Sequence, residues 1–315
     1  MRRHDGVSTQ SADAPQPPKQ PRRVPAIGRR HASCDRLRNG AHRSGALVKL
    51  SIVIPARNEG PNLQGTVQRL HERLALEGIS DYEIVVVDDG STDDTPTVLE
   101  GLCRIEPKVR RITNTGRHGY GRAVRLGLHN CTGDAIVITM ADASDDPEDV
   151  AAYYRVLRDE SECVFGSRFI RGSELVDYPR VKLVINRLVN LAIKLIFNIK
   201  CNDVTNAFKG FRRYVIDGCQ PLISPHFNLT IEIPLKAVVR GYSYKVLPVA
   251  WRNRTSGTSQ LVLKEQGSRY LYTLLSVWFE WLLVRGDFER QDRDSVDSWE
   301  QHARRESGCQ TSETQ

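Results

Sequence analysis

Acidic residues follow three separate apolar runs of this chain. Asp88 and Asp89 come directly after EIVVV, and Asp142 comes shortly after AIVITM. Glu59 stands four residues after the run SIVIP. If these runs are neighbouring parallel strands, their carboxylates meet at one edge of a sheet and repel one another unless a cation or a donor-rich ligand lies among them. A base, a ribose and a metal-bound diphosphate would satisfy such a site. In a single loop such residues would be caps and turn formers, but three loops together favour a ligand site.

The apolar runs alternate with segments of helical periodicity. Leu63, Val67, Leu70 and Leu74 recur at helical spacing after the first run, and Pro96 suits the first turn of a second helix. Runs that are β-branched and apolar throughout are typical of buried parallel strands. The pattern therefore predicts an α/β fold with a Rossmann-like, mostly parallel sheet flanked by helices. The predicted strands are residues 50–55, 83–87, 110–113 and 135–140.

The ordered set of motifs resembles the family 2 glycosyltransferases, which have the GT-A fold. Their first and second strands are similar to SIVIPARNEGPNL and EIVVVDDGSTDDT. The polyprenyl-phosphate branch, which includes the dolichol-phosphate mannosyltransferases, is similar to the later segments GYGRAVRLGL, GDAIVITMADASDDPED, VFGSRF, DVTNAFKGFRR and VLPVAWRNRTSGTS. The resemblance covers residues 48–260 and implies a glycosyltransferase.

The resemblance also implies a donor pocket for a nucleotide-diphospho-sugar. Pro55, Ala56 and Glu59 would lie around the base and ribose, and Asp88 and Asp89 would lie in the same pocket. The default donor of the branch is GDP-mannose, although a pocket for glucose or an N-acetylhexosamine would need only small changes. We therefore expect a hexosyl donor, with mannose as the first choice.

A divalent cation is expected at the end of the fourth strand. By resemblance, Asp142 and Ser144 would hold Mg²⁺ or Mn²⁺ against the donor diphosphate, and oxygen ligands suit both ions. The family usually carries Asp-x-Asp here, but alignment on Ser144 and Pro147 places Met140 where the first acid belongs. Either Asp142 and Ser144 bind the metal with water and phosphate, or Asp145 joins them.

Cationic residues of the second half are candidates for the acceptor site. By resemblance, Arg168 and Arg180 face the acceptor phosphate, and Lys209 and Arg254 are further candidates. Arginine suits phosphate because its planar fork donates two hydrogen bonds while staying charged. Each arginine alone could equally be a surface charge. We expect Asp142, Arg168 and Arg180 to carry catalysis by positioning and electrostatics.

Two segments have the pattern of amphipathic helices. Residues 181–199 place a polar residue every fourth position in an otherwise apolar sequence, which predicts a narrow polar stripe on a helix. Residues 270–284 carry tryptophans and tyrosines, which prefer the headgroup level of a membrane. Both favour helices that lie in a membrane interface. The alternatives are burial of the first against another subunit and packing of the second on the sheet.

The predicted organisation has a basic arm, one enzyme domain and a tail. Residues 1–49 hold eleven Lys and Arg against three Asp, a net charge of +8 in a chain of +7. The arm reads as disordered. The predicted segments are the arm 1–46, the GT-A domain 47–260 with a donor half 48–146 and an acceptor half 147–260, the interface helix 181–199 within it, the amphipathic helix 261–288 and the disordered tail 289–315.

The composition of the chain favours one type of cellular compartment and disfavours one class of partner. The seven cysteines include no CxxC pair, which argues against a zinc site and a disulfide framework and favours free thiols in a reducing compartment. The sequence shows neither a leader nor an apolar run of transmembrane length, so we expect a cytoplasmic protein, peripheral at the membrane surface. Nucleic-acid binding is disfavoured because no aromatic platform accompanies the arginines.

These observations predict the inverting transfer of a hexosyl group from a nucleotide-diphospho-sugar to polyprenyl phosphate. A phosphate oxygen is already nucleophilic, so the reaction needs no strong general base. The alternative within the family is a polysaccharide or other non-lipid acceptor. From another class, a non-catalytic membrane scaffold would fit the loss of an acid at Met140, but Asp88, Asp89 and Arg168 argue against it.

Overall fold

The computed structural model describes residues 48–176, 178–252 and 263–288. The expected arm 1–46, the tail 289–315 and the acceptor candidate Arg254 lie outside the described residues. The description below concerns the α/β unit that contains the candidate site.

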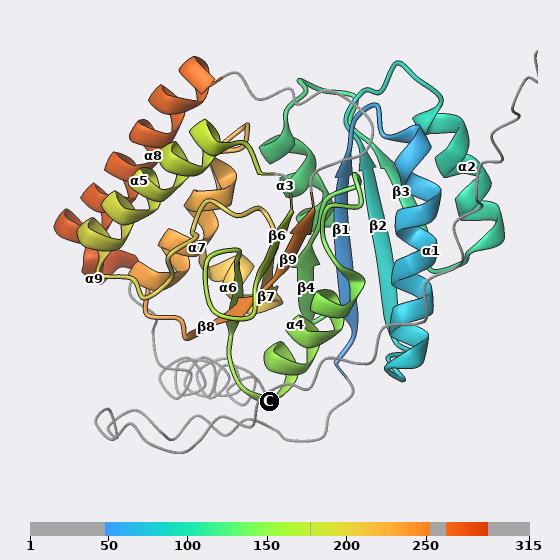
Figure 1. Ribbon diagram of the computed structural model, residues 1–315, viewed down its shortest axis with the longest axis horizontal. Coiled ribbons are helices and arrows are strands. Elements are labelled where there is room, and N and C mark those ends of the chain that lie inside the picture. Colours follow the sequence, from blue (N-terminus) through green and yellow to red (C-terminus); the bar gives the residue numbers. More distant parts are fainter. Residues whose placement is uncertain (1–47, 177, 253–262, 289–315) are drawn as a thin grey trace, which may run out of the picture. The chain divides into compact units, whose positions relative to one another are not determined.

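A seven-stranded sheet forms the centre of this unit, and Figure 1 shows it between two groups of helices. Six strands are mutually parallel, and β7 runs antiparallel to both of its neighbours. The fold expected from the sequence, a mostly parallel α/β sheet flanked by helices, is confirmed. In spatial order the strands are β3 (Val109–Thr113), β2 (Tyr82–Asp88), β1 (Leu50–Ala56), β4 (Ala135–Ile138), β7 (Lys209–Arg212), β5 (Cys163–Ser167) and β8 (Tyr244–Pro248).

The register brings the polar loops to one place, which we call the carboxyl edge of the sheet: the edge at which β1, β2 and β4 end. Ala56 pairs with Asp88 at the ends of β1 and β2. Because β7 is reversed, its first residue, Lys209, pairs with Ile138 near the end of β4 and with Phe165 of β5. The carboxyl edge therefore carries acidic loops and one lysine at its centre.

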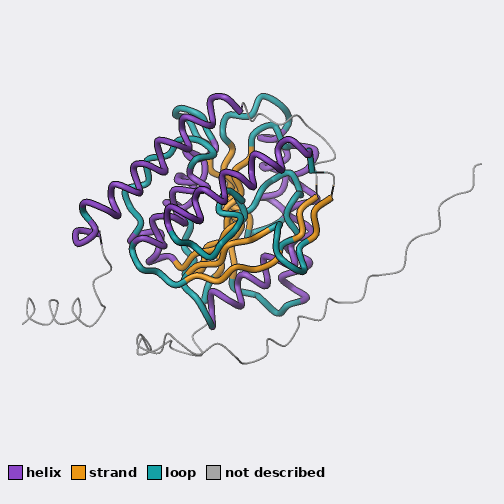
Figure 2. Tube along the Cα trace, turned by 60° about the vertical axis from the view of Figure 1, so that its left-hand side comes forward, coloured by secondary structure: helices purple, strands orange, loops and turns teal. Residues whose placement is uncertain are grey.

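Helices cover both faces of the sheet, as the strands in the interior of Figure 2 show. Alternate strand residues feed two apolar cores, because successive side chains point to opposite faces. The first core packs α1 (Gly60–Leu76), α2 (Thr95–Ile105) and α4 (Pro147–Asp159) on one face. The second packs α3 (Tyr120–Asn130), α5 (Arg180–Phe197), α6 (Arg213–Gly218) and α7 (Leu229–Val239) on the other face. Helix α8 (Leu263–Leu283) adds Val277 to this second core, and the short helix α9 (Arg285–Phe288) comes next in the chain.

The fourth strand is shorter than expected. Its predicted range reached residue 140, but β4 ends at Ile138. The Asp145 carboxylate explains the early end, because it accepts hydrogen bonds from the Met140 backbone N–H and the Thr139 hydroxyl, both at 3.0 Å. The chain therefore turns at this point and brings the residues after β4 back across the carboxyl edge.

A second, two-stranded sheet lies beside this turn. It pairs β6 (Glu174–Val176) with β9 (Ala250–Arg252) in parallel, and a single bridge joins Asp145 to Trp251. Neither of its strands is among those predicted from the sequence. Strand β9 also contacts α4, because the Ala250 N–H donates to Asp149, 101 residues away along the chain.

Candidate active site

The loop after β2 is tied to the start of α3 through Asp89. Its carboxylate accepts hydrogen bonds from the Asn114 amide at 2.6 Å and from the Gly119 backbone N–H at 2.7 Å. The ring of His118 stands 3.5 Å from the same carboxylate. Asp89 is buried, so these donors replace the water that its charge would otherwise need. The predicted donor residue thus shapes the loop that would close over a nucleotide.

Asp88 and Glu59 take part in the same arrangement of loops. Asp88 accepts a hydrogen bond from the Ser91 N–H at 3.0 Å, and Arg111 lies 3.6 Å from its carboxylate. Glu59 precedes α1 and accepts from the Asn62 amide at 2.9 Å. Pro55 and Ala56 are buried at the end of β1. The structure therefore gathers all five predicted donor residues at the ends of the neighbouring strands β1 and β2, while their role in binding a nucleotide stays a prediction.

The candidate metal corner lies at the turn after β4. Asp142 is buried and accepts a hydrogen bond from the Ser144 N–H at 3.1 Å across Ala143, which has a left-handed φ of 60°. That tight turn brings the Asp142 carboxylate to the backbone of Ser144. Burial and the charge of Asp142 raise the pKa of Asp145 to about 6, so the corner is short of positive charge.

The residues at this corner fit a cation that is shared with a phosphate ligand. The described part of the chain has no group of three or more His, Cys, Asp or Glu side chains able to hold a metal. Mg²⁺, however, is commonly bound through one or two carboxylates together with substrate phosphates. The buried carboxylate of Asp142, the hydroxyl of Ser144 and the negative charge around them are suited to binding Mg²⁺ in this way. Asp142 and Ser144 would hold the ion, and Met140 supplies no ligand oxygen from its side chain.

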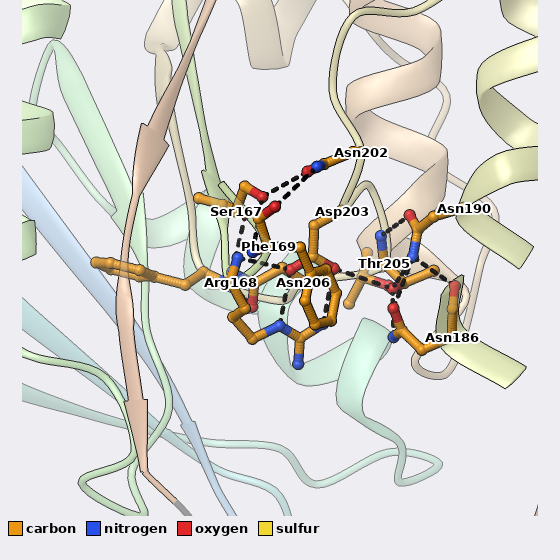
Figure 3. A network of polar contacts seen from close by, with 12 residues as sticks. Ser167, Arg168, Phe169, Asn186, Asn190, Asn202, Asp203, Thr205 and Asn206 are labelled. Atoms are coloured by element: carbon orange, nitrogen blue, oxygen red, sulfur yellow. Dashed lines mark hydrogen bonds and ion pairs between the residues drawn. The ribbon is translucent and has the colours of Figure 1, made fainter. Parts of the chain in front are cut away.

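Arg168, the first acceptor candidate, is held by a buried carboxylate, as Figure 3 shows. Asp203 accepts from Arg168 Nε and Nη2, both at 2.7 Å, and from the Arg168 backbone N–H at 3.0 Å. Although burial opposes the charge, Asp203 raises the pKa of Arg168 above its usual range. The Tyr178 ring also lies 5.5 Å from the guanidinium. Arg168 therefore remains a cation, held between Asp203 and Tyr178.

The two halves of the candidate site meet at Asp145. Its carboxylate interacts electrostatically with Asp142 on one side and with Arg168 on the other. Lys209 belongs to the same cluster: it is 2% exposed, its ammonium donates to the Asn206 carbonyl, and burial lowers its pKa to about 8. Asp145 and Lys209 thus interact electrostatically with the predicted acceptor residue Arg168, and Asp145 interacts with Asp142 as well.

Arg180 differs from the other candidates in its surroundings. It is exposed at the first position of α5 and forms no ion pair with any residue in the described part of the chain. Tyr178 lies two residues before it, and the Arg168 guanidinium stands 5.5 Å from the Tyr178 ring. Arg180 is therefore close in sequence to the Arg168 cluster, but no contact joins the two arginines directly.

Asp203 and Thr205 are the residues that the sequence analysis missed. Both lie in the quoted motif DVTNAFKGFRR, which was used for the resemblance and for Lys209. A buried arginine requires a carboxylate partner, and that demand was the signal that could have drawn attention to Asp203. The partner stands 35 residues away from Arg168, so spacing alone could not identify it.

Helix α5 carries an exposed apolar face beside this cluster. The expected polar stripe exists, but its middle turns inward: Asn190 is buried and Asn186 is half-buried. The outer face is apolar instead. Its exposed members are Val181, Val184, Ile185, Leu188, Leu191, Leu195 and Ile196.

Helix α8 lies alongside α5 in Figure 1 and contacts it. Its polar residues point to α7: Thr273 accepts from the Asn228 amide at 2.9 Å, and Glu280 accepts from Arg240 at 2.8 Å. This arrangement leaves apolar side chains outside. The exposed ones are Leu271, Tyr272, Leu275, Phe279, Leu282, Leu283 and Val284. No helix within the described ranges has the length and apolarity needed to cross a membrane.

The fold matches solved GT-A glycosyltransferases. Glucosyl-3-phosphoglycerate synthase from Mycobacterium tuberculosis, solved with Mn²⁺, UDP and glucosyl-3-phosphoglycerate, is 21% identical with a TM-score of 0.57 over 73% of this chain and 80% of that chain. A second structure of that enzyme, solved with UDP, gives 19% identity and a TM-score of 0.57. The expected GT-A fold is confirmed.

The family model for glycosyl transferase family 2 matches residues 51–219, and the chain belongs to this family. A dolichol-phosphate mannosyltransferase from Pyrococcus furiosus is 29% identical over 236 residues, 72% of this chain and 64% of that relative. The chain thus spans less than two thirds of that relative's length. A polyprenol monophosphomannose synthase from Mycolicibacterium smegmatis is 26% identical over 245 residues, 76% of this chain and 88% of that protein.

Proposed function

We propose that this protein transfers a hexosyl group, mannose in the first place, from a nucleotide-diphospho-sugar to polyprenyl phosphate. The names of the two relatives support the reaction class. The observation that carries the proposal is the position of Arg168: its charge interacts with Asp145, which also interacts with Asp142 of the metal corner, and the helix that follows exposes an apolar face. A phosphate joined to a long apolar chain fits both features.

The reaction is a single displacement at the anomeric carbon. An oxygen of the acceptor phosphate forms the new bond to that carbon while the bond to the donor diphosphate breaks, which inverts the configuration and releases a nucleoside diphosphate. Arg168 and Arg180 orient the acceptor phosphate and offset its charge as it approaches the negatively charged donor. The loops held by Asp89 and Glu59 bind the base and ribose, and GDP-mannose is the proposed donor.

A divalent cation belongs to the proposed reaction. Asp142 and Ser144 would hold Mg²⁺ or Mn²⁺, and the ion would neutralise the charge that develops on the leaving diphosphate. The Mn²⁺ in the structural relative supports a divalent cation, and assays with Mg²⁺ and with Mn²⁺ determine which ion gives turnover. Asp145 keeps the turn after β4 in place through the Met140 N–H and so fixes the position of Asp142.

The protein is proposed to work as a peripheral protein at the cytoplasmic face of the membrane. The exposed faces of α5 and α8 would sink into the headgroup region, where amphipathic helices bury their apolar side. Tyr272 and Phe279 of α8 suit that depth because aromatic side chains favour the interface. The acceptor phosphate would then reach Arg168 and Arg180 without leaving the membrane surface.

The test is an assay with radiolabelled donors. Purified protein is incubated with vesicles that contain polyprenyl phosphate, with Mg²⁺ or Mn²⁺, and with GDP- and UDP-sugars in turn, followed by extraction of the lipid. We expect a labelled lipid that mild acid cleaves, and no label with the Asp142→Asn variant. Label in a water-soluble product instead would indicate a non-lipid acceptor, and no product with any donor would contradict the proposal.

A further inference from the structure

Helix α5 contacts the protein in two different ways along its length. In its second half it buries Ile193 and Phe197 in the apolar core. In its first half the side chains of Asn186 and Asn190 face the turn that contains Thr205, where Figure 3 shows them converging. The spacing of these four residues places them on one face of the helix. The half nearer to the candidate acceptor site is therefore attached through amide hydrogen bonds.

The hydroxyl of Thr205 has a fixed direction. Asn186 Nδ2 donates to it at 2.9 Å and Asn190 Nδ2 donates at 3.0 Å. A hydroxyl has two acceptor sites and one proton. Asn186 Nδ2 occupies one acceptor site, and Asn190 Nδ2 divides its two protons among Thr205 Oγ1, the Asn186 carbonyl at 2.9 Å and Asn186 Oδ1 at 2.8 Å. The proton is left to point to Asp203 Oδ1, which lies 3.5 Å away. Asn190 Oδ1 also accepts from the Thr205 N–H at 3.3 Å, which holds the same residue by its backbone.

Asp203 passes this constraint to the side chain of Arg168. It is completely buried, and its Oδ1 faces both Thr205 and Arg168 Nη2. The backbone beside Arg168 has further contacts, because Ser167 Oγ donates to Asn202 and the Asn202 amide donates to the Phe169 carbonyl. Asp203 holds both the backbone N–H and the guanidinium of Arg168, and Thr205 lies next to the oxygen that accepts from Nη2.

We propose that Thr205, held by Asn190 of α5, is a positioning residue that orients Arg168 through Asp203 for the acceptor phosphate. The inference rests on the proposed function for the identity of that phosphate. A guanidinium binds phosphate well only when its plane is correctly set, since its donors form a rigid fork. The amide contacts of α5 also tie this orientation to the helix that carries the exposed apolar face.

The experiment compares Thr205→Val with Thr205→Ser in the full-length protein. Valine has nearly the same shape but lacks the hydroxyl, while serine keeps it. We expect Thr205→Val to raise the KM for polyprenyl phosphate about tenfold, the size of one lost hydrogen bond to a charged group, with an unchanged KM for the nucleotide sugar. Thr205→Ser should remain within about twofold of the unsubstituted protein in both constants.

A purely structural role would give another result, because a smaller folded fraction lowers the apparent kcat and leaves both KM values alone. That outcome, or equal KM values in Thr205→Val and the unsubstituted protein, overturns the inference. A double-mutant cycle adds a second check: Asn190→Leu and Thr205→Val should together cost no more in acceptor KM than the larger of the two, since they break one relay. Independent, multiplying effects would contradict it.

Calorimetric binding of a short isoprenyl phosphate keeps this inference separate from the proposed function. The measurement needs no turnover, so it applies even if no donor gives a lipid product. Weaker binding by Thr205→Val, restored by Thr205→Ser, supports the relay on its own. Equal affinity in all three proteins contradicts the relay, whereas absence of lipid product in the unsubstituted protein contradicts the proposed function.

Discussion

At the scale of single residues, Met140 is where this chain departs from its family. Its backbone N–H donates to the Asp145 carboxylate, and Met140 precedes Asp142 by two residues in the sequence. The change Met140→Asp would add a carboxylate at the metal corner. We expect it to tighten Mn²⁺ binding roughly tenfold, because a second anionic oxygen favours a divalent ion. Activity measured as a function of Mn²⁺ concentration and isothermal titration calorimetry with Mn²⁺ both measure this affinity.

The matched control is Met140→Asn, because asparagine has nearly the size of aspartate but no charge. This variant should leave the Mn²⁺ affinity close to that of the unsubstituted protein. If aspartate and asparagine at this position gave the same affinity, position 140 would lie too far from the ion to serve as a ligand. Asp142 and Ser144 would then need another partner, and Asp145 would be the residue to substitute next.

At the scale of elements, Glu83 joins three parts of the sheet. Its carboxylate accepts from Ser51 of β1 at 2.7 Å, from Arg110 of β3 at 2.6 Å and from Thr132 after α3. Burial alone would raise the pKa of Glu83, but the Thr132 N–H and these other donors lower it to about 2. Ionised Glu83 is therefore more stable in the folded than in the unfolded chain.

This depressed pKa predicts a pH-dependent stability. Glu83 contributes on the order of 3 kcal/mol at most to the free energy of unfolding. This contribution is present at neutral pH and is lost as the pH falls from about 4.5 towards 2. Urea unfolding of the protein and of Glu83→Gln measures it. The difference in unfolding free energy should shrink over that range of pH. A difference that did not vary with pH would show that the charge of Glu83 is unimportant.

The elements themselves were largely predictable, and the way they are joined was not. The run EIVVV specifies a buried strand because every side chain after Glu83 is apolar and β-branched, and Leu63 to Leu74 specify a helix by their spacing. The residue types of the short run KGFR do not indicate whether the strand pairs in parallel or antiparallel with its neighbours. The antiparallel direction of β7 and the burial of Lys209 therefore could not be predicted.

The candidate site shows the same limit. The family resemblance named Arg168 from its local motif, but its partner Asp203 is fixed by long-range packing. The periodic asparagines of residues 181–199 defined a polar stripe without indicating which side of the helix faces the protein. The structure turns Asn190 inward, where it meets Thr205. The functional roles of all these residues remain predictions.

At the scale of the whole molecule, the apolar faces of α5 and α8 predict binding to a membrane surface. The double variant Leu188→Glu with Leu275→Glu places one charge on each exposed face. We expect it to lose flotation with vesicles that the unsubstituted protein retains, because a carboxylate disfavours burial in the acyl region. Flotation on a sucrose gradient is the measurement.

The chain offers a matched control on the opposite face of the sheet. Leu76 of α1 and Ile105 of α2 are 80% and 76% exposed, against 61% for Leu188 and 44% for Leu275, so Leu76→Glu with Ile105→Glu adds the same charge at exposed positions. This control should float like the unsubstituted protein. Equal flotation of both double variants would mean that α5 and α8 do not form the membrane-binding surface.

The central claim is that a polyprenyl monophosphate accepts the sugar. The most direct measurement gives the purified protein one labelled donor, GDP-mannose, and compares polyprenyl phosphate with the matching polyprenol and with a soluble phosphate monoester. The account predicts label in the organic phase with polyprenyl phosphate alone, with inverted anomeric configuration. Equal labelling of the polyprenol, or label in the soluble ester alone, would contradict it.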